Sequence, residues 1–273
     1  MIAIARITIL EALRRKVLLS AVLMTGAFLA LYGFFVSHQA MTTPSGLPTM
    51  MREVADLDLG SLFCYFMIAF FAIFSVSGSV SAEIESGILA SVLPRPVRRR
   101  DVVVGKWLGF ALVQVIYVSL VLAALMLIVG AYDPLPGAAH LFSVWACFVL
   151  EAWGLSAVTL LGSVLLPTLA NGIGLALWYF ITFLSGSYAQ LPFSQSAAMR
   201  QVEFLVALCL PSDGLFRRAV YELASGSLTA VPLNLLGPFG VQQVPSWGYV
   251  AYAAGYVPVM LALAVWAFSR RDV

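Results

Sequence analysis

Charged side chains are scarce in this sequence of 273 residues. It has 15 Lys and Arg and 13 Asp and Glu, so 10% of the chain is charged, against roughly 25% in an ordinary soluble domain. A water-soluble fold of this length needs far more surface charge, and the composition therefore excludes one. The formal net charge of +2 indicates little by itself, and no nucleic acid is expected among the partners.

Histidine and cysteine are also scarce, which limits the chemistry open to the chain. His38 and His140 fall at predicted outer membrane edges, and neither has a Cys, Asp or Glu at metal-ligand spacing. Each cysteine lies inside an apolar run and is expected to pack as a small hydrophobic residue; these are Cys64, Cys147 and Cys209. We therefore expect no metal site, no cofactor and no intramembrane catalysis in this chain.

Hydrophobic residues, in contrast, make up 62% of the chain. They gather into runs near 20 residues, the length that a helix needs to cross about 30 Å of hydrocarbon. The sequence thus predicts an all-α polytopic membrane protein with one transmembrane domain over residues 1–273. The six predicted spans are residues 17–37, 59–80, 102–130, 141–165, 169–189 and 247–268.

An amphipathic interfacial helix is predicted before the first span. Apolar residues share one face of its helical wheel, namely Ile2, Ile9, Leu10, Leu13 and Val17. Such a helix lies along a membrane surface with its apolar face in the bilayer. The alternative is that these residues simply extend the first span.

Basic residues are unevenly distributed between the predicted loops. With the amino terminus inside, the cytoplasm receives Arg6, Arg14, Arg15, Lys16, Arg95, Arg98, Arg99, Arg100, Lys106, Arg270 and Arg271. The outside receives only Arg52, Arg200, Arg217 and Arg218. Cytoplasmic loops carry the excess of Lys and Arg in membrane proteins. We therefore expect a multi-pass protein of the bacterial inner (plasma) membrane with both termini in the cytoplasm.

Residues 190–246 are predicted to form an outward-facing region with surface-lying or re-entrant helices. Within it, residues 202–210 are apolar but too short to span, and Pro211 closes them. A short helix is expected next, because Ser212 can cap it and Asp213 favours its positive amino end. The alternative is that residues 202–210 do span, which would move the carboxyl terminus to the outside.

Residues 82–100 form the most charged stretch that is predicted to face the cytoplasm. Glu83 and Glu85 suit the start of a helix, and apolar residues follow at helical spacing up to Val92. Pro94-Arg95-Pro96 then breaks the chain before a basic cluster. One interpretation is a short helix whose apolar face fits a groove on a partner. The other is a basic loop that anchors on the anionic headgroups of the lipid bilayer.

This stretch resembles the coupling segment of permeases in the type-two exporter family of ATP-binding-cassette (ABC) transporters. The matching patterns are Glu-x-Glu-x-Gly, then Leu-x-Arg-Pro-Val-x-Arg within residues 83–99, then Gly-Lys-x-x-Gly at 105–109. The helix before the first span and the closing Arg270-Arg271-Asp272 also resemble this family.

The resemblance implies a permease subunit of an ATP-driven exporter. It implies pairing with a second copy or a homologous permease, and with two separate ABC ATPase subunits that bind ATP and Mg. The residues implied in coupling to the ATPase are Glu83, Glu85, Gly87, Ile88, Leu89, Arg95, Pro96, Arg98 and Arg99. An alternative is that the same fold transmits force to a periplasmic partner through residues 190–246, as in transporters of the metalloenzyme-maturation type. An ATP-independent channel is the third possibility.

The pair Gly105-Lys106 does not indicate ATP hydrolysis by this chain. A phosphate-binding loop needs a Gly five residues before its second Gly and a Ser or Thr after the Lys. Those two positions hold Arg100 and Trp107. The chain is therefore not expected to be an enzyme, and the ATPase must be another chain.

Glu151 is the one acid near the middle of a predicted span. An ionised carboxylate there costs on the order of 3 kcal/mol on insertion scales, so the side chain should face protein or water rather than lipid. One interpretation is a contact with substrate, a cation or a subunit interface. The other is a packing residue that is protonated or hydrogen-bonded to Ser156, Gln114 or Asn171.

Overall fold

The structure is a computed structural model that describes residues 2–14, 16–42, 47–85, 99–190, 197–226, 241 and 243–270. These residues form helices and turns without a β-strand. Six helices are long and apolar enough to cross a membrane: α2 (Lys16–Thr42), α3 (Leu47–Val76), α6 (Arg99–Gly130), α7 (Ala138–Leu165), α8 (Thr168–Ala189) and α11 (Trp247–Arg270). The shorter α1 (Ile2–Arg14) precedes them. This confirms the predicted fold class.

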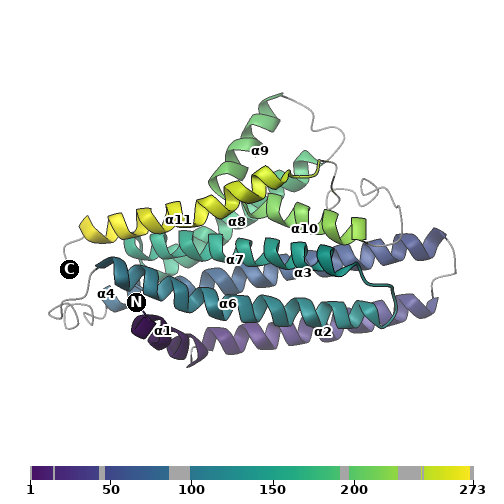
Figure 1. Cartoon of the computed structure of the whole chain (residues 1–273), viewed down its shortest axis with the longest axis horizontal. Helices are drawn as coiled ribbons and strands as arrows, with labels where there is room; N and C mark the ends of the chain where they lie inside the picture. The colour runs from purple at the N-terminus through teal and green to yellow at the C-terminus, as the bar shows by residue number, and fades with distance from the viewer. Residues whose placement is uncertain are drawn as a thin grey trace.

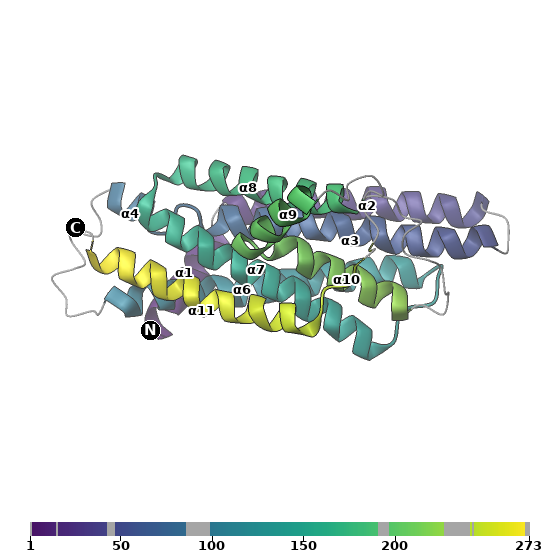
Figure 2. The same ribbon diagram turned by 90° about the horizontal axis from the view of Figure 1, so that it is seen from above.

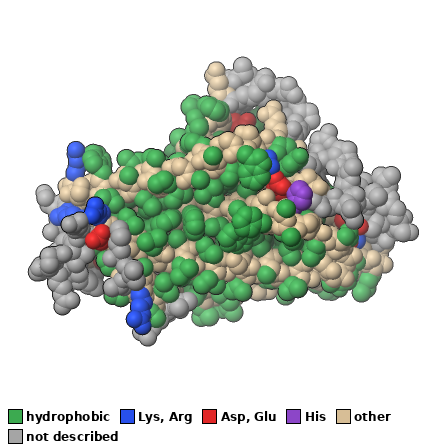
Figure 3. All heavy atoms as spheres, in the orientation of Figure 1, with side chains coloured by type: hydrophobic (Ala, Val, Ile, Leu, Met, Phe, Trp, Pro, Cys, Tyr) green, Lys and Arg blue, Asp and Glu red, His purple; other side chains and the backbone are tan. Residues whose placement is uncertain are grey.

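The six long helices run side by side along the long axis of the molecule (Figures 1 and 2). Both chain ends and the short helix α4 (Ser81–Glu85) lie at one end of this bundle. The face in Figure 3 is mainly hydrophobic along its middle, with Lys and Arg gathered mostly toward that same end. This pattern is typical of a bundle whose middle lies in hydrocarbon.

Helix α7 is the centre of the bundle and α2 is its periphery. Helix α7 contacts α3, α6, α8 and α11, and 67% of its most apolar stretch is buried, whereas only 11% of the corresponding stretch of α2 is buried. Lipid tails are as apolar as a protein core, so α2 needs no cover on its outer face. Polar and charged side chains that should not face lipid are therefore expected around α7.

Helix α3 begins at Leu47, well before the predicted start at residue 59. The sequence predicts a loop over residues 38–58, which include Arg52, Asp56 and Asp58. In the structure all three are buried in a helix, and Arg52 forms ion pairs. Ion pairing offsets the cost of burying Arg52 and Asp56, so the helix can extend through them.

Two short helices follow α8 and join it to α11. Helix α9 (Ala197–Cys209) is too short to span, because its 13 residues cover about 20 Å at 1.5 Å each. It is not among the candidate spans found in the described residues, and the topology of residues 202–210 stays a prediction. Helix α10 (Ser212–Gly226) is buried from its start to Val220 and packs against α7 and α3. Helix α10 is thus covered by the long helices, and whether it lies at the surface or re-enters the membrane stays a prediction.

Tyrosines of α11 hold the carboxyl end of α9 in place. The hydroxyls of Tyr249, Tyr252 and Tyr256 donate to the backbone oxygens of Ala207, Leu208 and Cys209, at 3.2, 2.5 and 2.6 Å. The last carbonyls of a helix have no partner within it, so these bonds satisfy groups that would otherwise be orphaned. The turn from α9 to α10 is thus fixed against α11.

Candidate functional site

The predicted coupling segment begins in α4 and ends in the first turn of α6, at the end of the bundle that carries both chain ends. Of its predicted contact residues, the structure describes the side chains of Glu83 and Arg99 and the backbone of Glu85. The others lie outside the described residues: Gly87, Ile88, Leu89, Arg95, Pro96 and Arg98. Their role in coupling stays a prediction.

Lys106 of α6 joins the two sides of this segment. Its Nζ donates to the backbone oxygen of Ser79 at 2.5 Å and lies 2.6 Å from Oε1 of Glu83. The lysine is 6% exposed, so its charge is removed from water and must be compensated by these partners. Ser79 lies in the turn after α3, and Glu83 lies in α4. One buried cation therefore connects α3, α4 and α6.

Arg99 connects the other end of the segment to α11. Its guanidinium donates from NH1 to the backbone oxygen of Phe268 at 2.8 Å and lies 5.7 Å from the centroid of the Phe268 ring. Phe268 is in the last turn of α11, where carbonyls lack helical partners and a positive charge is favourable. The start of α6 is thus attached to the end of the last span.

Gly109 allows α1 to pack closely on α6. A Cβ at Gly109 would lie 2.8 Å from both the backbone oxygen of Ala5 and Cβ of Thr8. Such distances are shorter than real Cβ contacts, so only glycine allows this approach. The Gly-Lys-x-x-Gly pattern, which sequence reasoning rejected as a phosphate loop, therefore positions α1 through Gly109 and α4 through Lys106.

Replacing Gly109 with valine is expected to displace α1, because the new methyl groups meet the backbone of α1. The measurement is the reactivity of a Thr8→Cys reporter toward a maleimide in purified protein from which the native cysteines have been removed. Thr8 is 3% exposed, so the reporter should be protected with Gly109 and reactive with valine. The matched control is Gly26→Val, where an added Cβ meets nothing within 4 Å. Equal protection in both variants would contradict the prediction.

Glu151 lies in the interior of the bundle, with 2% of its surface exposed. Its neighbour is Tyr179 of α8, whose hydroxyl oxygen lies within hydrogen-bond distance of Oε1 of Glu151, at 3.0 Å, and of the backbone oxygen of Tyr65, at 2.9 Å. The partners expected from the sequence, Ser156, Gln114 and Asn171, were wrong, since Asn171 instead donates to Ser77 and Thr159. This bond is compatible with either interpretation of Glu151, as packing residue or as substrate contact.

The amino end of α10 places an ion pair beside α8. Arg217 donates from Nε and NH2 to the two carboxylate oxygens of Asp213, at 2.7 and 3.1 Å, and both residues are buried. The carboxylate also packs on Gly186, where a Cβ would lie 2.0 Å from Oδ2. Burial raises the pKa of the Asp213 carboxyl above its ordinary value, and the neighbouring Arg217 guanidinium limits the rise.

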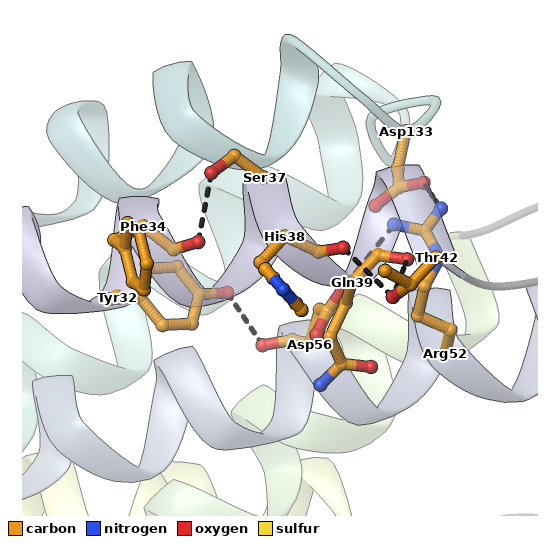
Figure 4. Close-up of polar contacts among 9 residues, drawn as sticks. All are labelled: Tyr32, Phe34, Ser37, His38, Gln39, Thr42, Arg52, Asp56 and Asp133. Carbon is orange, nitrogen blue, oxygen red and sulfur yellow. Dashed lines mark hydrogen bonds and ion pairs between the residues drawn. The ribbon is translucent and has the colours of Figure 1, made fainter.

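A second ionic cluster lies at the end of the bundle away from the chain ends (Figure 4). Arg52 of α3 binds Asp133 after α6 and lies 3.6 Å from Asp56 one turn along its own helix. The hydroxyl of Tyr32 of α2 donates to the backbone oxygen of Asp56 at 2.6 Å. This cluster ties α2, α3 and the α6–α7 turn together.

A third cluster attaches α10 to its neighbours. Glu222 accepts from Arg218 on its own helix, and its Oε2 lies 2.8 Å from Nδ1 of His140 at the start of α7. The guanidinium of Arg218 stacks 4.2 Å from a Trp247 ring at the start of α11. Sequence reasoning treated Arg217 and Arg218 only as outer-loop charges.

The signal for these clusters was present as acid–base pairs four residues apart, the spacing that places side chains on one face of a helix. Among the residues that the structure describes, three such pairs form ion pairs: Arg52 with Asp56, Asp213 with Arg217, and Arg218 with Glu222. Within the part of the chain that the structure describes, no three or more His, Cys, Asp or Glu residues are placed to hold a metal ion.

Comparison with protein-family models extends this picture to the whole chain. Residues 2–273 match the family described as "ABC-2 family transporter protein". A search of curated proteins gave no match. The match covers the six candidate spans, the preceding helix and the predicted coupling segment together. The chain is therefore a multi-pass membrane protein that belongs to the ABC-2 transporter family.

Proposed function

We propose that this chain is the permease subunit of an ATP-driven ABC exporter in the bacterial inner membrane, with both termini in the cytoplasm. The observation that carries the proposal is the family match over residues 2–273. Two further observations support it: both chain ends lie at the same end of the bundle, and the predicted cytoplasmic loops hold most of the basic residues.

The proposal requires partners, because the chain has no phosphate-binding loop. Two separate ATPase subunits would bind ATP and Mg, and a second copy or a homologous permease would complete the transport path. ATP binding would draw the ATPases together and push on residues 82–100. The spans would then tilt as rigid bodies and open a path to the outside.

Within this segment, the apolar residues would make the ATPase contact. The sequence places Ile88 and Leu89 at helical spacing with Ile84 and Val92, which predicts a shared apolar face. The basic residues from Arg95 to Arg100 would keep the segment beside the lipid headgroups. The two functions are separable by mutation.

Replacing both Ile88 and Leu89 with Asp is expected to release the ATPase, since unpaired charges in a desolvated groove cost several kcal/mol. The measurement is the amount of ATPase that co-purifies with the membrane subunit. Insertion into the membrane is checked separately by extraction and protease protection.

The matched control replaces Arg98, Arg99 and Arg100 with Gln. This variant is expected to weaken membrane orientation more than ATPase binding, because the basic residues act mainly on topology. Normal insertion of the Asp variant with full ATPase occupancy would overturn the coupling assignment and favour the lipid-anchoring loop.

A further inference from the structure

Lys106 has an environment that a simple membrane anchor does not need. A lysine near a helix end normally extends its ammonium to the headgroups and water. Here the ammonium is turned inward, with 8% of the side chain exposed, against 60% for the side chain of nearby Arg100. Arg100 lies 3.8 Å from Asp101, its own chain neighbour, and has no ion pair with another helix among the described residues. Lys106 and Arg100 therefore differ in kind.

Lys106 and its two partners lie on opposite sides of residues 86–98 in the sequence. Ser79 and Glu83 precede residues 86–98, and α6 follows them. The short turn between α3 and α4 is held by backbone bonds, such as those from Ser79 to Val76 and from Ala82 to Gly78, and by the side chains of Ser81 and Asn171, which donate to the backbone oxygen of Ser77. Lys106 closes this turn onto α6.

The neighbouring contacts extend the same connection to two further spans. The hydroxyls of Ser81 and Thr168 are 2.8 Å apart, which joins the start of α4 to the start of α8. Arg99 joins the start of α6 to the end of α11. Displacement of the coupling segment would therefore be transmitted to α3, α6, α8 and α11 through side chains that are already in contact.

We infer that Lys106 is a positioning residue that makes α4, the turn after α3 and the start of α6 move as one body. The inference rests on the proposed function, in which an ATPase pushes on residues 82–100. A push on the segment then tilts α3 and α6 together. Without Lys106, the same push bends the turn at residues 77–80, and α3 and α6 do not tilt with α4.

The test measures the distance between two nitroxide labels by pulsed electron paramagnetic resonance. One label is at Ala82, which is exposed on α4, and the other at Leu120, which is 66% exposed on α6. Leu120 is 14 residues beyond Lys106, about 21 Å along the helix, which suits the method. The chain is studied alone and in complex with its ATPase, in lipid nanodiscs.

With Lys106 present, we expect one narrow distance peak that a non-hydrolysable ATP analogue does not move. In the permease alone, Lys106→Met should broaden the distance distribution so that the narrow peak is lost. In the complex with the ATPase, the ATP analogue should shift the distance between the two labels. Glu83→Gln keeps an acceptor without its charge and should show a smaller form of both effects, including where Lys106→Met fails to insert. Leu108→Met, at an exposed position of α6 two residues beyond Lys106, is the control and should match the unmodified chain.

A narrow, unmoved peak in Lys106→Met would overturn the inference. A broadened peak that the ATP analogue does not shift would reduce Lys106 to a structural contact and would also overturn it. Failure of the proposed function gives a different result: no ATPase would co-purify even with the unmodified chain.

Discussion

Replacing Arg52 with methionine is expected to lower the free energy of unfolding by about 3–5 kcal/mol, the usual cost of removing one partner of a buried ion pair. The substitution leaves the carboxylates of Asp56 and Asp133 buried without their cation, at 1% and 7% exposure. The connection from α3 to the α6–α7 turn is lost as well (Figure 4). The measurement is denaturant unfolding of the purified protein in detergent micelles.

The matched control for Arg52→Met is Asp133→Asn. In this variant Arg52 keeps Asp56 and still meets a polar side chain, so we expect a loss of about 1–3 kcal/mol, typical of one weakened buried hydrogen bond. The asymmetry between the two variants is the diagnostic result. Equal losses would show that Arg52 and Asp133 act as an isolated pair and that Asp56 does not depend on the cation.

The positions of the six spans could be predicted because a span needs a long apolar run and nothing else in the chain has one. The same criterion failed at the start of α3. A charged residue is a good loop signal only if it faces water, and Arg52 and Asp56 face each other. Paired charges one helical turn apart should have been counted as helix rather than loop.

Contacts between helices could not be predicted in the same way. In a soluble helix the apolar face indicates which side is buried, but a membrane helix is apolar on its lipid side too. Hydrophobicity therefore does not indicate which face of α7 or α8 packs into the bundle. For this reason the contact between Glu151 and Tyr179 was missed. The pairing of Lys106 with Glu83 was missed for a related reason. The sequence between these two residues does not indicate how α4 lies relative to α6.

The family resemblance supplied what periodicity could not. It selected residues 82–100 as a coupling segment, where the residues alone left a docking helix and a lipid-anchoring loop equally open. It also selected Gly105, Lys106 and Gly109 without giving them a physical role. The structure gives that role to two of them: Gly109 permits contact with α1, and Lys106 binds the chain on the other side of the segment.

Removing the cation at the start of α10 is expected to have an effect as large as the loss of Arg52, and it should also depend on pH. Arg217→Met leaves Asp213 buried against Gly186 without its bidentate partner, at an expected cost of about 3–5 kcal/mol near neutral pH. The measurement is the free energy of unfolding from pH of about 4 to about 8, a range that begins at the ordinary pKa of an Asp carboxyl.

The sign of the pH dependence follows from the pKa of Asp213. Burial raises this pKa above its ordinary value, so the folded state holds the proton more tightly than the unfolded state. Stability contributed by the neutral carboxyl is therefore present at acid pH and lost as pH rises through the folded pKa. Arg217 limits the rise of the pKa, so Arg217→Met should extend this loss to higher pH. The gap between variant and parent should widen from acid to neutral pH.

The double variant Arg217→Met with Asp213→Asn is the control, because it removes the titrating group together with the cation. Its unfolding free energy should lack the added pH dependence and should recover part of the loss at neutral pH, as expected when both charges of a buried pair are removed. A gap that stays constant with pH in the single variant would show that Arg217 acts through packing alone. The ion pair would then not be what fixes the amino end of α10 against α8.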